Sequence, residues 1–245
     1  MLKPSDIQLV ILTVPRKPEY IHSTLASLFA SDPLVHKLPP IQLMVGDADA
    51  GYLDCYRQHS RTHIRPLGEP EAKRIMDWGP HRRMCHNYHR CLTVPRERAK
   101  GVCICEDDIV VCDGFISRLI ATVEEMEGAH GLRKYLLACY VPYRLGVEPA
   151  FRRGRYYASY PAESYYGTQC MYYPAAVLDE LADHLRRFGV DEHRAPGDML
   201  VKEYGIAING VYGTVKSIAQ HIGRQSTGLG DFHAAPTFGE EFPLG

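Results

Sequence analysis

The hydrophobic positions of this chain form short apolar runs that alternate with stretches of helical periodicity. Residues 7–14, "IQLVILTV", are mostly apolar and β-branched and end at Pro15, which is typical of a buried strand. Apolar residues recur at helical spacing within residues 17–31, and residues 41–47, "IQLMVGD", have the pattern of a second buried strand. A strand, a helix and a strand in this order predict two parallel strands joined by a crossover helix.

The same alternation continues along most of the chain. Apolar runs predict further strands at residues 101–106, 135–141, 166–173 and 206–213. Helical periodicity predicts further helices at residues 80–92, 113–128, 174–189 and 197–204. Loops and hairpins are expected between residues 142 and 166, where no period is clear, and the Gly- and Pro-rich end of the chain is expected to be irregular. We therefore predict an α/β fold in a single domain, residues 1–245, with a sheet that is mostly parallel in its first half and mixed later.

The composition fits a soluble globular protein and excludes some partners. The 245 residues are 45% hydrophobic and 23% charged, and the formal net charge of −1 gives no overall field that would recruit nucleic acid or an anionic membrane. No segment approaches the ~20 continuous apolar residues of a membrane helix, and the N-terminus lacks the pattern of a secretory signal. We therefore expect a cytoplasmic protein without a membrane span, in which the eight Cys are mostly reduced thiols.

Three of the predicted strands end in polar residues, at positions 13–16, 47–49 and 106–108. Ligands of open α/β sheets bind outside the carboxyl ends of the strands, and these three ends are expected to lie side by side. Glu106, Asp107 and Asp108 follow a buried run, where carboxylates are costly unless a cation neutralises them. An isolated acidic triplet is usually a solvated turn, but this one stands beside two other polar strand ends. The position favours a hard divalent cation, Mg²⁺ or Mn²⁺.

Four stretches of the chain, in order, are similar to those of a known family: "TVPRKPEYIHSTLASL", "RMCHNYHRCL", "EDDIV" and "QHIGRQST". The chain resembles the GT-A glycosyltransferases, and most closely the N-acetylglucosaminyltransferase IV family. The resemblance implies the Rossmann-like GT-A fold of nucleotide-diphospho-sugar transferases, a mixed sheet flanked by helices. It also implies a nucleotide-binding half at residues 1–112 and an acceptor-binding half at residues 113–245 that ends in a metal-ligand segment.

The resemblance also implies roles for individual residues. Those expected to bind the nucleotide sugar are Thr13, Val14 and Arg16 in the nucleotide pocket, Asp47 at the uracil or ribose, Arg83 and Asn87 on the nucleotide side, and Glu106 and Asp107 at the ribose and donor sugar. Asp108 is expected to coordinate Mn²⁺ or Mg²⁺, with His221 as the second protein ligand. An isolated His is more often structural, but its place after a late strand and beside Gly223 favours a metal ligand.

The reaction implied by the resemblance is an inverting, metal-dependent transfer of a sugar, N-acetylglucosamine, from a UDP-sugar to a hydroxyl of a glycan or small-molecule acceptor. For the general base we choose Asp198 in "APGDMLVKEYG", because GT-A enzymes place a catalytic carboxylate at the start of a late helix. Asp198 is alternatively the N-cap of that helix, and Asp191, Glu192 and Glu203 are competing candidates for the base.

The chain also departs from the family. It shows no counterpart of the anchor, stem and lectin-like domain of Golgi members, and Gln225 stands where relatives tend to have a second His. We therefore expect a shortened relative with an acceptor other than an N-glycan. Tyr165 and Tyr166, in a Tyr-rich stretch, are weaker candidates for contact with the acceptor, because aromatic rings with hydroxyl tips suit sugars. Core packing is the alternative for these Tyr.

Other functions and metals remain as alternatives. A sugar nucleotidyltransferase would carry a Gly-rich phosphate loop near its N-terminus, and "ILTVPRKPEY" contains no Gly. A non-catalytic relative that binds a sugar or a partner protein is disfavoured by the intact acidic residues. Cys85 and His89 are one helical turn apart, and Cys103 and Cys105 share one face of a strand, but structural zinc sites usually show a Cys-x-x-Cys pair, which is missing. Small buried thiols are the preferred explanation.

Overall fold

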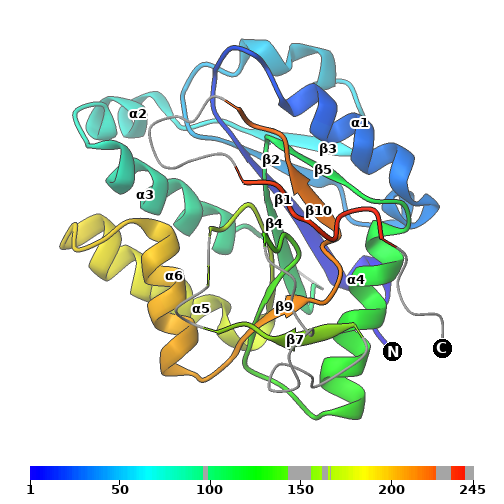
Figure 1. The fold of residues 1–245 in the computed structure, drawn as a ribbon. Helices are drawn as coiled ribbons and strands as arrows, with labels where there is room; N and C mark the ends of the chain where they lie inside the picture. The colour runs from blue at the N-terminus through cyan, green and yellow to red at the C-terminus, as the bar shows by residue number, and fades with distance from the viewer. Residues whose placement is uncertain (96–98, 143–155, 162–164, 166, 225–232, 241–245) are drawn as a thin grey trace.

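The parallel pairing predicted from the N-terminal pattern is present in the computed structural model. Strand β1 (Ile7–Thr13) lies between β2 (Ile41–Val45) and β4 (Gly101–Glu106) and pairs in parallel with both (Figure 1). The structure describes residues 1–95, 99–142, 156–161, 165, 167–224 and 233–240. Strand β1 is buried along nearly its whole length because it is central in the sheet and both faces of the sheet are covered.

The sheet is mixed beyond β4. It has eight strands in the order β3-β2-β1-β4-β8-β6-β9-β7, of which the remaining five are β3 (Thr62–Arg65), β6 (Leu136–Ala138), β7 (Tyr157–Ser159), β8 (Cys170–Pro174) and β9 (Val211–Thr214). Strand β8 is antiparallel to both neighbours, whereas β6 and β9 are parallel. A separate two-stranded sheet pairs β5 (Ile109–Val111) with β10 (Ala219–His221). The predicted α/β fold with a mixed sheet is confirmed.

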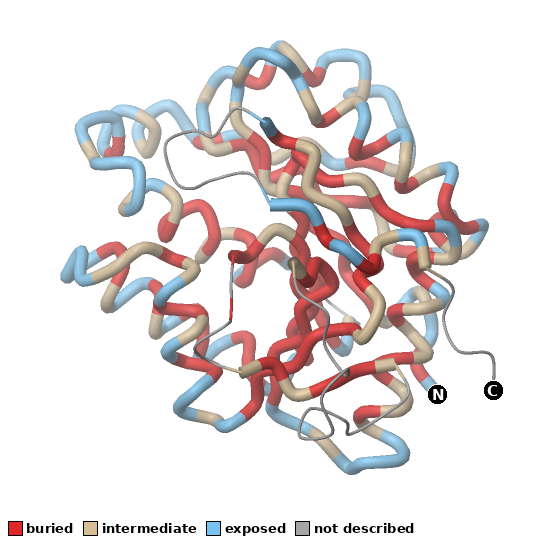
Figure 2. The backbone as a smooth tube through the Cα atoms, viewed as in Figure 1, coloured by how far each residue is buried: buried red, intermediate tan, exposed pale blue. Residues whose placement is uncertain are grey.

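Helices cover both faces of the large sheet. On one side lie α1 (Ile21–Ser31) and α4 (Phe115–Glu124), and on the other lie α3 (Pro80–Leu92), α5 (Ala175–Leu185) and α6 (Gly197–Ala207) (Figure 1). The shorter elements are α2 (Glu69–Ile75), the 3₁₀ turns η1 (Pro4–Asp6), η2 (Pro33–Lys37) and η3 (Gly51–Tyr56), and the π turns η4 (Glu125–Ala129) and η7 (Arg186–Asp191). Figure 2 shows that the strands form the buried centre while the helices expose their outer sides. Among the helices within the described ranges, none combines the length and the apolar character that a membrane span requires.

Helix α3 shows why some elements were predictable to the residue. Pro80 occupies its first turn, where no intrahelical N–H is needed. Its buried residues include Cys85, Tyr88 and Leu92, which recur at helical spacing and face the sheet core. The predicted range of 80–92 is confirmed.

The late strand is the main error of the sequence prediction. Residues 206 and 207, predicted as strand, are the last two of α6, and β9 begins only at Val211. The apolar run misled the prediction because Ile206 is 50% exposed on the helix. Asn209 then adopts a left-handed backbone conformation, φ 49°, which ends the helical path before the strand. The predicted strand at 135–141 is shorter than expected, at Leu136–Ala138.

Replacing Gly101 by Ala is expected to destabilise the sheet at the β4–β8 pairing. A methyl group at this position would lie 2.3 Å from the hydroxyl oxygen of Tyr172, whose side chain is fully buried and has no room to move. We expect a loss of about 1–3 kcal/mol in the free energy of unfolding, measured by urea denaturation. Gly128→Ala is the matched control, because nothing lies within 4 Å of the added methyl. Equal stability of the two variants would contradict this packing.

Candidate active site

The three polar strand ends predicted from the sequence meet at one cavity. The parallel register pairs Leu12 of β1 with Glu106 of β4 and Thr13 with Val45 of β2, so the chain leaves all three strands at the same edge. A cavity of ≈ 650 Å³ opens there. Its lining includes these predicted site residues: Thr13, Val14, Arg16, Asp47, Arg83, Asn87, Glu106, Asp107, Asp108, Asp198 and His221.

The turn after β4 is held by hydroxyl groups from neighbouring elements. The Thr24 hydroxyl oxygen, on α1, lies 2.6 Å from the carbonyl oxygen of Asp107 and 2.7 Å from that of Ile109, so its single proton is shared between these two acceptors. The Thr13 hydroxyl donates to Oδ2 of Asp107 at 2.6 Å. Arg16 forms ion pairs with both aspartates, to Asp107 and, at 3.1 Å, to Oδ2 of Asp108. Both carboxylates are therefore buried but each has polar partners, as buried charges require.

Asp108 and His221 are neighbours although 113 residues separate them in the chain. The antiparallel pairing of β5 with β10 aligns Ile109 with His221, and Nε2 of His221 lies 3.1 Å from Oδ2 of Asp108. Gly223 permits the approach, because a methyl group there would lie 2.2 Å from Oδ2 of Asp108. The two predicted metal ligands are thus brought together by the fold.

The burial of three adjacent carboxyl groups changes their proton affinity. Burial, together with the charges of Asp108 and Asp107, raises the pKa of Glu106 to about 8. Burial also raises the pKa of Asp107 to about 6, although Arg16 and Thr13 act in the opposite direction. Burial acts to raise the pKa of Asp108 too, but the hydrogen bond of His221 and the charge of Arg16 outweigh it, so the net pKa of Asp108 is lowered. Asp108 is therefore the most readily ionised carboxyl of the three.

The residues around Asp108 fit a hard divalent cation. Oδ1 of Asp108 is buried and has no hydrogen-bond partner within the described residues, so one carboxylate oxygen is free to coordinate. A carboxylate and an imidazole leave several positions for water and phosphate oxygens, as Mg²⁺ and Mn²⁺ require.

Helix α3 and the loop after β2 also contribute to the lining of the cavity. Asn87 is buried on α3, and its Oδ1 has no hydrogen-bond partner within the described part of the chain. Gly46 makes room for it, since a methyl group there would lie 2.5 Å from Nδ2 of Asn87. Asp47 and Arg83 are exposed at the cavity rim.

Asp198 enters the cavity from the first turn of α6. The N-cap of this helix is Pro196, so the alternative role of Asp198 as the N-cap is not what the structure shows. The competing carboxylates are occupied elsewhere and do not line the cavity: Asp191 pairs with Arg186, Glu192 with Arg187, and Glu203 with Arg194. Asp198 is thus the one of these four candidate bases that lines the cavity.

The Tyr residues and several cavity residues differ from the expectation. Tyr165 is 7% exposed, packs against Tyr160 and is not part of the cavity lining, so the geometry gives its acceptor role no support. Tyr166 lies outside the described residues. Thr168 and Gln169 line the cavity and were missed, and the Thr168 hydroxyl donates to Glu106 at 3.2 Å. They lie within the predicted strand 166–173, whereas β8 begins only at Cys170, and the carbonyl oxygen of Gln169 accepts from the N–H of Glu106. The lining residues Met199 and His233 had no signal in the sequence.

The fold is that of the GT-A glycosyltransferases. S. aureus TarS 1-349 matches with a TM-score of 0.54 and 14% sequence identity, over 85% of this chain and 57% of that chain. The same protein in complex with UDP-GlcNAc matches with a TM-score of 0.52 and 12% sequence identity, over 90% of this chain and 59% of that chain. GalNAc-T7 with UDP, GalNAc and Mn²⁺ matches with a TM-score of 0.64 and 10% sequence identity, over 91% of this chain and 44% of that chain. The chain thus spans less than two thirds of the length of each of these structures.

Comparison at the level of sequence gives a different result. The chain matches no protein-family model and no curated protein. The membership of the N-acetylglucosaminyltransferase IV family, which the motifs suggest, therefore stays a prediction.

Removing the Thr24 hydroxyl is expected to loosen the acidic turn. Thr24→Val keeps the shape of the side chain but removes the donor for the carbonyl oxygens of Asp107 and Ile109. We expect a loss of about 1–3 kcal/mol in the free energy of unfolding, because a buried polar group loses its partner. The control Thr24→Ser keeps the hydroxyl and should lose only about 0.8 kcal/mol for the missing methyl. Urea denaturation measures both, and a valine variant as stable as the serine variant would contradict the assigned role.

Proposed function

We propose that this protein is a metal-dependent glycosyltransferase that moves a sugar from a UDP-sugar to the hydroxyl group of an acceptor. The observation that carries the proposal is the meeting of Asp108 and His221 at a cavity formed by the carboxyl ends of β1, β2 and β4, within a GT-A fold. Nucleotides bind at this place in α/β sheets. The volume of ≈ 650 Å³ lies within the range of small-molecule sites, roughly 300–1,000 Å³.

The donor nucleotide would lie against the β1–α1 loop and the rim formed by α3. Thr13, Val14 and Arg16 line the cavity at this loop, and Asp47 offers a carboxylate to uracil or ribose donors. Arg83 and Asn87 of α3 also line the cavity. The Arg83 guanidinium suits a phosphate group, and the Asn87 carbonyl oxygen, which has no hydrogen-bond partner within the described residues, suits an amide or hydroxyl donor. Glu106 and Asp107 line the same cavity, where ribose and donor-sugar hydroxyls would reach them.

Asp108 and His221 would hold the divalent cation. When bound there, Mn²⁺ or Mg²⁺ supplies positive charge that stabilises the leaving diphosphate. Arg16 contributes a further positive charge beside the same carboxylates. The presence of Mn²⁺ and UDP in the GalNAc-T7 structure supports this choice of ion.

Asp198 would accept the proton from the acceptor hydroxyl. Helix α6, which carries it, is a separate element from the β5–β10 sheet, which holds His221 and directly follows Asp108 (Figure 1), and all three side chains line the cavity. A base and a leaving group on different sides of the sugar suit direct displacement with inversion at the anomeric carbon. The family resemblance supports the same stereochemistry, and N-acetylglucosamine as the sugar. UDP-GlcNAc is also present in the TarS complex.

Loss of the Asp108 carboxylate is expected to abolish metal-dependent nucleotide binding. For Asp108→Asn, isothermal titration should show UDP affinity in the presence of Mn²⁺ reduced by at least about 10–100-fold, the size of effect seen for outer-shell partners of metals. Asp113→Asn, an exposed carboxylate directly after β5, is the matched control and should bind normally. If both variants bind UDP and Mn²⁺ like the wild type, the proposed metal site is wrong.

Loss of the Asp198 carboxylate is expected to stop transfer but not binding. We expect kcat for transfer from UDP-N-acetylglucosamine to fall by about 10²–10⁴-fold in Asp198→Asn, the usual contribution of a general base, with unchanged affinity for UDP and Mn²⁺. The control Glu203→Gln lies on the same helix but pairs with Arg194 outside the cavity. NMR of the product should show an inverted anomeric configuration. Nucleotide binding without any sugar release would favour the non-catalytic alternative, and formation of UTP from pyrophosphate would favour the nucleotidyltransferase.

A further inference from the structure

Four cysteine thiols converge on one face of the central sheet, away from the cavity. Cys103 and Cys105 come from β4, Cys170 begins β8, and Cys139 follows β6 directly. The register sets Cys105 opposite Cys170, and the Cys139 N–H donates to the carbonyl oxygen of Cys170 at 2.8 Å. Three neighbouring strands, β4, β8 and β6, thus each contribute sulfur to one cluster.

The sulfur atoms are close enough to share one ion. The Sγ atoms of Cys103, Cys105 and Cys170 all lie within 4.8 Å of one another, and those of Cys105 and Cys170 are 3.5 Å apart. Cys139 lies in the same core beside this group, next to Cys170 in the β6–β8 pairing. Sulfurs that bind one Zn²⁺ at about 2.3 Å in a tetrahedron are roughly 3.8 Å apart. The Cys105–Cys170 separation of 3.5 Å is close to this value, and no pair among the three sulfurs exceeds 4.8 Å, so small side-chain adjustments would let them bind one ion.

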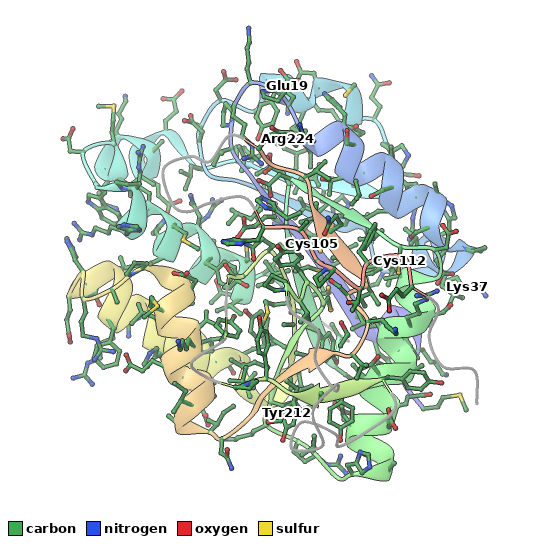
Figure 3. The ribbon with its side chains drawn as sticks, in the orientation of Figure 1. Glu19, Lys37, Cys105, Cys112, Tyr212 and Arg224 are labelled. Carbon is green, nitrogen blue, oxygen red and sulfur yellow. The ribbon has the colours of Figure 1, made fainter. Side chains whose placement is uncertain are left out.

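The surroundings of the cluster exclude hard cations. All four side chains are at most 1% exposed, and Cys105 lies in the interior of the molecule (Figure 3). Their neighbours in the same core are apolar or aromatic, including Tyr172. Thiolates prefer thiophilic ions such as Zn²⁺, whereas Mn²⁺ and Mg²⁺ prefer oxygen.

We propose that Cys103, Cys105 and Cys170, with Cys139 as the neighbouring thiol, form a structural site for a thiophilic divalent cation, with Zn²⁺ as its occupant. The site is separate from the hard-ion site at Asp108 and His221. Because the thiols have no contact with solvent, the ion enters while the chain folds, and its binding energy stabilises the folded state. It would hold together the strands whose cavity ends carry Glu106, the last residue of β4, and Gln169, which directly precedes β8.

The experiment measures metal binding during refolding. The full-length protein is unfolded in urea with a chelator and a reductant, then refolded with Co²⁺ as a spectroscopic probe for Zn²⁺. We expect one Co²⁺ per chain with an intense thiolate-to-cobalt charge-transfer band, which Zn²⁺ displaces. The melting temperature of the Zn²⁺-refolded protein should exceed that of protein refolded with chelator. Asp108→Asn should leave the band unchanged, which separates this site from the proposed active site.

Variants and direct metal analysis decide the outcome. Cys170→Ala should lose the band completely, while Cys91→Ala, a buried thiol in the core on the other side of the sheet, should keep it. If Cys170→Ala does not fold, native mass spectrometry of the purified wild-type protein gives the metal content without any variant. Wild-type protein that refolds without binding Co²⁺ or Zn²⁺, or that carries a Cys105–Cys170 disulfide, would overturn the proposal.

Discussion

The pairing of β5 with β10 is the interaction on which the candidate active site depends. Each strand has only three residues, and such a pair is marginal on its own. Two features fix it in place. The Thr24 hydroxyl holds the turn that precedes β5, and the ring of Tyr140 packs edge-on against His221, with 6.2 Å between centroids. The imidazole therefore reaches Asp108 in a set orientation, although it lies more than a hundred residues further along the chain.

The electrostatics of the site follow from this geometry. Three adjacent carboxyl groups are largely removed from water, which disfavours their charged forms. The three differ in the neighbouring groups that compensate for this loss of hydration. Burial and the charges of Asp108 and Asp107 disfavour the charged form of Glu106 despite the hydroxyl of Thr168, whereas Asp108 makes ion-pair contacts with both Arg16 and His221. Because Asp108 stays ionised and keeps one oxygen free, it is the carboxylate best suited to a divalent cation. A cation there would also favour ionisation of its two neighbours.

The sequence predicted those features that depend on local pattern and on parallel topology. Helix α3 has a clear apolar face, and the polar ends of β1, β2 and β4 had to meet because parallel strands end at the same edge. Strands β3, β5 and β10 were missed because they are three or four residues long and partly exposed, which leaves no period to detect. Gln169 and His233 were missed because their place in the cavity depends on antiparallel pairing and on the course of the C-terminal segment.

Strand β4 explains why the thiols were harder to interpret than the acids. Successive residues of a strand point to opposite faces, so Val102 and Ile104 pack under α3 and α5 while Cys103 and Cys105 face the other core. The hypothesis that Cys85 and His89 join Cys103 and Cys105 at one zinc ion was therefore geometrically wrong, since Cys85 lies on the far side of the sheet. The partners of β4 are instead contributed by β8 and β6, whose register no short motif encodes. A zinc motif defined by close sequence spacing cannot detect a cluster assembled by strand pairing, because Cys170 lies 65 positions beyond Cys105 and only the strand register brings the two together.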